Sequence, residues 1–277
     1  MGFIPAKAAL LSVAFLFGVT GCAAPESFGG SRENTVAWAS ARGFQAGELA
    51  AGPFHLLALT RQLTPINETL TVYIEGDGAS WATPWRPPRD PTPLKTIALA
   101  MAAADTANKV VYLGRPCQYL ADGELPSCDP AWWMERRFAP EVLTAYDEAL
   151  TQLKATLDAQ RLRLAGYSGG GVIAALLAAR RSDVELLVTV AAPLMLNEWA
   201  AWHDLTPFAG SSDPYLALGR LPPSIHWVGE KDTVVPPNII KKFVLKKGGR
   251  VVTMPDYDHE CCWARDWASL VAKENRE

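Results

Sequence analysis

The chain has 277 residues, of which 49% are hydrophobic, so it is long enough for one large domain with a full core. It carries 26 Lys and Arg against 29 Asp and Glu, for a net charge of −3, and this balance gives no reason to expect a nucleic-acid partner. The densest basic stretch, residues 241–250, is interpreted as a solvated helix face.

The N-terminal residues have the pattern of an export signal. Lys7 precedes the apolar run "AALLSVAFLFGV", which is too short to span a bilayer comfortably. The run ends in "VTGC" and resembles a bacterial lipobox. That resemblance implies cleavage before Cys22, lipidation of Cys22 and, with Ala23 next, an anchor in the outer membrane facing the periplasm. The alternative is an ordinary signal peptide cut at "GCAA" with Cys22 left free. The expected organisation is a signal peptide at 1–21, a lipidated N-terminus and tether at 22–42, and a folded domain at 43–277.

Short apolar strands alternate with helical segments along the rest of the chain. Strands are predicted as a pair within 43–60 and at 69–76, 109–114, 161–168, 184–192, 224–230 and 250–255; helices are predicted at 93–105, 139–160, 170–181, 237–247 and 264–275. This alternation predicts an α/β fold with a mostly parallel sheet covered on both faces. Functional residues of such folds gather at the carboxyl ends of the strands.

The sequence "GYSGGG" lies at one such end and satisfies Gly-x-Ser-x-Gly with Ser168 at its centre. The pattern alone is weak, but here a strand leads directly in and a helix leads directly out. The flanking glycines permit a tight turn that exposes the serine oxygen. A phosphate-binding turn is disfavoured, because no Walker lysine follows and no dinucleotide fingerprint is completed. Ser168 is therefore a candidate nucleophile.

A serine hydroxyl needs a base, and the base needs an orienting acid. His259 follows the strand 250–255 and precedes the last helix, which is where a base is expected. His55 and His226 lie within strands and are interpreted as structural. For the acid, Asp232 follows the strand 224–230 and is preferred over Asp256 and Asp258, which are too close to His259 in sequence.

The order Ser168, Asp232, His259, with the runs "GYSGG" and "GEKDTVVP", resembles the α/β-hydrolase superfamily, in particular its bacterial lipoprotein members. The resemblance covers residues 43 to about 275. It implies that Ser168 attacks a carbonyl, that His259 transfers the proton and that Asp232 holds the imidazole. It also implies an oxyanion hole with the Gly169 N–H as one donor.

The second oxyanion donor is expected from "IEGDGASW", residues 74–81, at the backbone of Asp77 or Gly78. Glu75 stands where the superfamily usually has a histidine. A carboxylate there would oppose a developing oxyanion unless it were turned away or neutralised. The arginines considered as partners for Glu75 are Arg86, Arg89 and Arg115.

An exported chain with Cys22 lipidated keeps four cysteines, Cys117, Cys128, Cys261 and Cys262, which allow three pairings. Cys117 and Cys128 could close one loop. Cys261 and Cys262 could then form a vicinal disulfide that stiffens the histidine loop, pair crosswise, or remain free buried thiols. Zinc is not expected, because no second ligand pair stands at a suitable spacing.

Residues 193–223 lie where the superfamily often inserts a lid, and about thirty residues form only a short cover. Residues that could wall an apolar substrate pocket are Trp81, Trp199, Trp202 and His203. No metal or cofactor is expected. The leading interpretation is a hydrolase of ester or thioester bonds in small to medium acyl substrates. The alternatives are a serine peptidase on short peptides and a non-catalytic envelope lipoprotein that binds a ligand.

Overall fold

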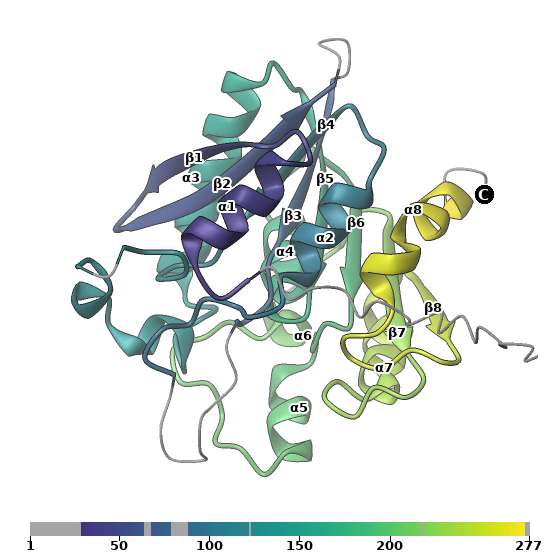
Figure 1. Cartoon of the computed structure of the whole chain (residues 1–277). Coiled ribbons are helices and arrows are strands. Elements are labelled where there is room, and N and C mark those ends of the chain that lie inside the picture. The colour runs from purple at the N-terminus through teal and green to yellow at the C-terminus, as the bar shows by residue number, and fades with distance from the viewer. Residues whose placement is uncertain (1–28, 64–67, 79–87, 122, 218, 275–277) are drawn as a thin grey trace, which may run out of the picture.

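An eight-stranded sheet in the order β1-β2-β4-β3-β5-β6-β7-β8 forms the centre of the molecule (Figure 1). Its strands are β1 (Gln45–Ala51), β2 (Phe54–Gln62), β3 (Thr69–Ile74), β4 (Lys109–Leu113), β5 (Arg161–Tyr167), β6 (Val184–Val190), β7 (Ser224–Gly229) and β8 (Arg250–Met254). β2 is antiparallel to both of its neighbours, and the other pairs are parallel. The predicted α/β fold with a mostly parallel sheet is confirmed.

The computed structural model describes residues 29–63, 68–78, 88–121, 123–217 and 219–274. The signal segment 1–21 and the lipidation candidate Cys22 lie outside the described residues. Trp81 and Arg86, which are candidates for the pocket and for a Glu75 partner, also lie outside them.

Helices cover both faces of the sheet and divide the core into two clusters. One face carries α3 (Pro140–Thr156), α4 (Gly169–Ala178) and α7 (Pro237–Lys247), and the other carries α1 (Arg32–Ser40), α2 (Ile97–Ala104) and α8 (Trp263–Glu274). All ten residues of α4 are buried, which explains its uniformly apolar and small sequence. The predicted helix at 139–160 is amphipathic as expected, because its buried residues recur at helical spacing.

Helix α1 corrects the expected domain boundary, since it lies within the segment 22–42 that was interpreted as a tether. Ser31 caps α1 by accepting a hydrogen bond from the Asn34 N–H, and Thr35 and Ala39 are buried. Arg32 forms an ion pair with Glu48 at 3.1 Å. Of the polar residues that suggested a tether, Glu33 and Asn34 face solvent on this short helix, whereas Thr35 packs on the domain together with Ala39.

The predicted lid stretch 193–223 is a connection between β6 and β7 that contains only short helices, α5 (Leu196–Trp202) and α6 (Pro214–Ala217). A second connection, between β4 and α3, contains the 3₁₀ helices η1 (Leu125–Ser127) and η2 (Pro130–Trp133). Phe138 N–H donates to Ser211 Oγ and Ser212 N–H donates to the Phe138 carbonyl, so the two connections are fastened together.

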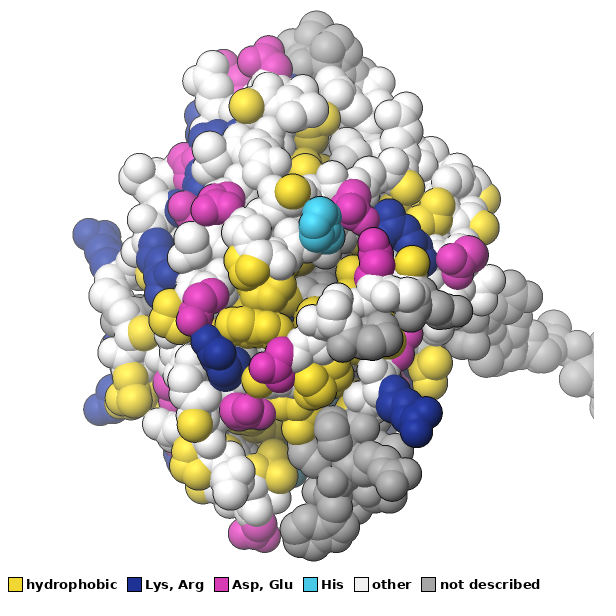
Figure 2. All heavy atoms as spheres, turned by 90° about the vertical axis from the view of Figure 1, so that its left-hand side faces the viewer, with side chains coloured by type: hydrophobic (Ala, Val, Ile, Leu, Met, Phe, Trp, Pro, Cys, Tyr) yellow, Lys and Arg dark blue, Asp and Glu magenta, His cyan; other side chains and the backbone are white. Residues whose placement is uncertain are grey.

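The face of the molecule at the left of Figure 1 has acidic and basic side chains interspersed around a hollow in which hydrophobic side chains are visible (Figure 2). None of the helices in the described part of the chain combines the length and the apolar character needed to cross a bilayer.

Candidate active site

Ser168 lies in the turn between the end of β5 and the first residue of α4, with a backbone φ of +50°. The close packing of this turn explains the two glycines of the motif. A Cβ on Gly166 would lie 2.3 Å from the Gly170 carbonyl oxygen, and a Cβ on Gly170 would lie 2.2 Å from the Ile74 carbonyl oxygen. The turn therefore presses against the end of β3 and holds Ser168 in an unusual backbone conformation.

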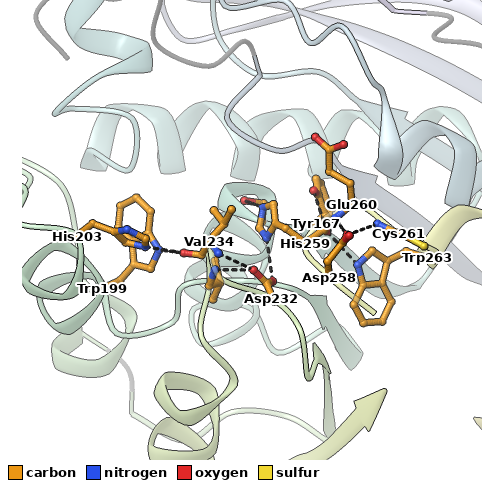
Figure 3. Close-up of polar contacts among 12 residues, drawn as sticks. Tyr167, Trp199, His203, Asp232, Val234, Asp258, His259, Glu260, Cys261 and Trp263 are labelled. Atoms are coloured by element: carbon orange, nitrogen blue, oxygen red, sulfur yellow. Dashed lines mark hydrogen bonds and ion pairs between the residues drawn. The ribbon is translucent and has the colours of Figure 1, made fainter. Parts of the chain in front are cut away.

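His259 lies between Ser168 and Asp232, as its position in sequence predicts (Figure 3). Its Nε2 is 3.2 Å from Ser168 Oγ, and its Nδ1 is 2.9 Å from Asp232 Oδ2. Because an ionised carboxylate only accepts, the Nδ1 atom carries the proton and Nε2 is left to accept from the serine hydroxyl. These distances suit proton transfer from the hydroxyl to the imidazole.

The Asp232 carboxylate is held by its own turn. Its Oδ1 accepts hydrogen bonds from the backbone N–H groups of Val234 and Val235 at 2.9 and 2.7 Å. The side chain is only 1% exposed. Hydrogen bonds from backbone N–H groups offset the cost of burying a carboxylate, and here they fix the direction in which Asp232 Oδ2 points at the imidazole.

The backbone around His259 is held from two directions. Its carbonyl accepts from the Tyr167 hydroxyl at 3.1 Å and from Trp263 Nε1 at 3.0 Å, and the Tyr167 ring packs against the imidazole. Asp258 Oδ1 accepts from the N–H groups of Glu260 and Cys261 and closes the turn (Figure 3). These contacts fix the direction of the imidazole before any substrate binds.

Cys261 and Cys262, which directly follow this turn, are bonded to each other, and Cys117 is bonded to Cys128. Of the three possible pairings, the structure therefore has the loop-closing bond together with the vicinal one. Whether the vicinal bond stiffens the histidine loop stays a hypothesis. Within the ranges that the structure describes, no cluster of three His, Cys, Asp or Glu could hold a metal ion.

Two side chains from the predicted lid stretch, Trp199 and His203, lie beside the turn of residues 232–235, which is called the acid turn below. Trp199 Nε1 and His203 Nε2 both donate to the Val234 carbonyl, at 2.6 and 2.8 Å (Figure 3). His203 is thus bound through its Nε2–H to the turn that holds Asp232. Trp202 is 59% exposed. Through these hydrogen bonds Trp199 and His203 connect α5 and the residue after it to the acid turn. The sequence did not suggest this role.

The two remaining histidines, His55 and His226, lie within strands β2 and β7, as predicted. His226 is fully buried in β7 with Nδ1 2.8 Å from Thr189 Oγ1, and burial lowers its pKa to about 4. His55 is exposed and pairs with Glu48.

On the other side of Ser168 lie Gly169 and the turn that follows β3. Gly78 has φ +88° and passes so close to the Pro91 carbonyl that a Cβ would lie 1.8 Å from its oxygen. A Cβ on Gly169 would lie 1.9 Å from Asp77 Oδ1. The structure therefore places the Asp77 side chain against Gly169, the residue after Ser168. The oxyanion hole formed by the N–H groups of Gly169 and of the Asp77–Gly78 turn stays a prediction.

In the described part of the chain, Glu75 binds backbone N–H groups, and neither Arg89 nor Arg115 pairs with it. Its Oε1 accepts from the N–H groups of Gly76 at 2.9 Å and of Ala98, in the first turn of α2, at 3.4 Å. Arg115 forms an ion pair with Asp77, and Arg89 is exposed. The carboxyl group is turned away from Ser168 into the protein, where burial raises its pKa to about 7 against the opposing effect of these N–H groups.

Arg137 is a residue of this region that sequence reasoning missed. It lies in an irregular segment before α3, and its Nε is 3.2 Å from Asp77 Oδ2. Nothing in its sequence neighbourhood, "WMERRFAP", distinguishes it from Arg136, which is only half-buried. Only the fold reveals that one of the two arginines points inward.

Comparisons with known proteins agree with this architecture. No protein-family model and no curated protein matches the sequence. Among solved structures, an alpha-beta serine hydrolase homologue from Coxiella burnetii has a TM-score of 0.55 and 16% identity, covering 84% of this chain and 96% of that chain. Est1E from Butyrivibrio proteoclasticus, with ferulic acid bound, has a TM-score of 0.59 and 14% identity, covering 84% and 100%. A puromycin-hydrolyzing peptidase from Mycobacterium tuberculosis has a TM-score of 0.58 and 14% identity, covering 83% of this chain and 38% of that chain.

The chain therefore has the α/β-hydrolase fold. The sheet order, the Ser168 turn between β5 and α4, and the positions of Asp232 after β7 and His259 after β8 all fit that fold.

Proposed function

We propose that the protein is a serine hydrolase that cleaves carboxylic ester or thioester bonds through Ser168, His259 and Asp232. The observation that carries the proposal is the continuous contact from Ser168 Oγ through both imidazole nitrogens to Asp232. Its supports are the strained serine turn and the fold shared with esterase structures.

In the proposed reaction Ser168 Oγ attacks the substrate carbonyl while its proton passes to His259 Nε2. Asp232 stabilises the imidazolium through the Nδ1 proton. The Gly169 N–H donates to the developing oxyanion, together with a backbone N–H of the Asp77–Gly78 turn. The imidazolium then protonates the leaving group, and water hydrolyses the acyl-enzyme with His259 as the base.

The cover over the site favours small to medium acyl groups. The connection between β6 and β7 has only two short helices, and Trp199 and His203 fasten it to the acid turn. A short connection that is held by hydrogen bonds leaves less room for a long acyl chain than a separate cap domain would.

The first test is labelling of the purified protein with a fluorophosphonate probe, beside Ser168→Ala and heat-denatured samples. We expect labelling of Ser168 that is lost in both controls, followed by hydrolysis of short 4-nitrophenyl esters. Absence of labelling in folded protein would reject the hydrolase and favour a ligand-binding lipoprotein.

Peptide hydrolysis is the second candidate, because the same groups cleave amides and one structural neighbour is named as a peptidase. Comparing 4-nitrophenyl esters with 4-nitroanilides of the same acyl groups separates the two. An anilide rate within about tenfold of the ester rate would favour the peptidase, since esters are the intrinsically easier substrates.

We also propose that the protein is exported and anchored by lipid on Cys22, facing the periplasm from the outer membrane. The "VTGC" sequence and the two disulfides support this, since disulfides persist in oxidising compartments. The proposal predicts that a Cys22→Ala variant is released from the membrane fraction, and that mass spectrometry of the native chain finds an acylated Cys22 at its N-terminus.

A further inference from the structure

Two buried arginines lie beside the serine turn and share a single carboxylate. Arg115 Nη1 is 2.9 Å from Asp77 Oδ1, and Arg137 Nε is 3.2 Å from Asp77 Oδ2. Asp77 in turn lies against Gly169, the residue after Ser168. Arg137 is therefore separated from the serine turn by one side chain.

The two guanidinium groups are not equivalent. Arg115 uses Nη1 for Asp77 and Nη2 for the Arg137 carbonyl at 2.9 Å. Among the described residues, the one charged partner of the Arg137 side chain is Asp77, reached through Nε with an alignment that does not make a hydrogen bond. In the described part of the chain, neither terminal nitrogen of Arg137 has a hydrogen-bond partner, although the side chain is only 10% exposed.

The Arg137 guanidinium has an aromatic ring on one face and one shared carboxylate at its Nε. The ring centre of Phe208, from the connection between β6 and β7, lies 4.2 Å from the guanidinium carbon in a cation–π contact, and Phe208 stacks on Trp199. Burial lowers the pKa of Arg137 and the Arg115 charge adds to this, while Asp77 opposes both. Among the described residues, Asp77 is the carboxylate that both arginines share, and it balances one of the two positive charges. The other charge lies in a nearly closed place beside the proposed active site.

We propose that Arg137 is an anion-recognition residue of the substrate site, and that the preferred substrates carry a carboxylate near the ester bond that is cleaved. This proposal rests on the proposed hydrolase function and names its substrate class. A carboxylate accepts two parallel hydrogen bonds from a guanidinium edge, which are the bonds that the terminal nitrogens of Arg137 are able to donate. The aromatic ring of Phe208 would cover the chain that links the carboxylate to the ester.

The proposal is tested with 4-nitrophenyl hemiesters of succinate, glutarate and adipate, each paired with the 4-nitrophenyl diester in which the free carboxylate is a methyl ester. We expect the wild type to prefer the charged member at one chain length by about tenfold or more in kcat/KM. The Arg137→Gln variant should lose this preference, by about ten- to a hundredfold for the hemiester, while the methyl ester changes far less.

Arg136 provides a matched control variant. It is the adjacent arginine, its side chain is 38% exposed, and it pairs with Glu141 at 2.7 Å and lies over Trp132. Arg136→Gln removes the same charge one residue away and should leave the ratio of charged to neutral substrate unchanged. If Arg137→Gln folds poorly, Arg137→Lys keeps the charge without the planar edge and should retain only part of the preference.

A binding measurement separates failure of this inference from failure of the hydrolase proposal. In Ser168→Ala protein, monoethyl glutarate should raise the melting temperature and diethyl glutarate should not; the rise should vanish in the Ser168→Ala, Arg137→Gln double variant. Equal rates for charged and neutral esters in an active wild type, without binding of the monoethyl ester, would overturn the anion site and leave the hydrolase standing. Binding without any ester hydrolysis would support the anion site and reject the hydrolase.

Discussion

Asp232 and Asp77 are two carboxylates on opposite sides of Ser168, and they are held in opposite ways. Asp232 is 1% exposed and accepts from the backbone of its own turn, at Val234 and Val235. Asp77 is 29% exposed and is held by side chains 38 and 60 residues further along the chain, Arg115 and Arg137.

Because the two carboxylates have different partners, each suits a different role in the proposed reaction. Asp232 is surrounded by neutral N–H dipoles and faces one imidazole, so its charge is available to stabilise a proton on His259. The charge of Asp77 is already opposed by two guanidinium groups. Asp77 can therefore lie beside a developing oxyanion without the repulsion that an unpaired carboxylate would cause.

The largest expected effect is at Asp232. Replacing Asp232 by Asn keeps an oxygen for the Val234 and Val235 N–H groups but presents an amide to His259 Nδ1. This favours the wrong tautomer and should lower kcat by about 10⁴-fold. Steady-state kinetics with a 4-nitrophenyl ester measures it, and Asp256→Asn, in the exposed ion pair with Lys231, is the control. A loss below about tenfold would exclude Asp232 as the orienting acid.

Asp77 comes second, with an effect on stability. Asp77→Ala leaves Arg115 and Arg137 facing each other without a counter-charge and should cost about 2–3 kcal/mol of unfolding free energy, somewhat less than a fully buried pair. Urea denaturation measures it. Glu141→Ala removes one exposed partner of Arg136 and should change stability by less than about 0.5 kcal/mol. Equal effects of the two substitutions would contradict the uncompensated charge inferred here.

Glu75 is a third carboxyl group in the region. Its raised pKa makes the stability of the protein depend on pH. Its pKa of about 7 lies above the ordinary value of 4.5, so between these values the folded state holds a proton that the unfolded state has released. Its contribution to stability therefore falls as pH rises from about 4.5 through 7. Glu75→Gln removes this ionisation, so the variant should gain about 2 kcal/mol relative to wild type between pH 5 and pH 8.

Urea denaturation at several pH values measures the Glu75 effect, with Glu141→Gln as the exposed control. A constant difference between Glu75→Gln and wild type at every pH would show that Glu75 ionises normally in the folded protein.

The smallest expected effect concerns the hydrogen bond from Trp199 to the acid turn. Trp199→Phe removes the hydrogen bond from Nε1 to the Val234 carbonyl and should cost about 1 kcal/mol, since His203 still donates to the same oxygen. Trp202→Phe, three residues away and largely exposed, should have a smaller effect on the melting temperature. If Trp202→Phe were the more destabilising variant, the hydrogen bond from Trp199 to Val234 would not contribute to stability as proposed.

Much of the fold and of the Ser168 side of the site could be predicted because the signals are local. After Lys109, strand β4 is an apolar run, and the buried residues of α3 recur at helical spacing. The Gly-x-Ser-x-Gly turn joins a strand to a helix within a few residues. The tether prediction failed at α1 because a short helix with a narrow apolar face has nearly the composition of a linker. Arg89 and Arg115 were wrong as partners of Glu75, because its carboxylate binds backbone N–H groups, which leave no mark in sequence.

The sequence by itself determined the α/β order of elements, the turn that presents Ser168, and the positions of Asp232 and His259 after their strands, because each depends on residues adjacent in the chain. The tertiary structure alone decided that Asp77 is shared by Arg115 and Arg137, that Trp199 and His203 bind the acid turn, and that Arg137 rather than Arg136 is buried. These are pairings between side chains far apart in sequence. Their energies depend on burial and distance, which exist only once the chain has folded.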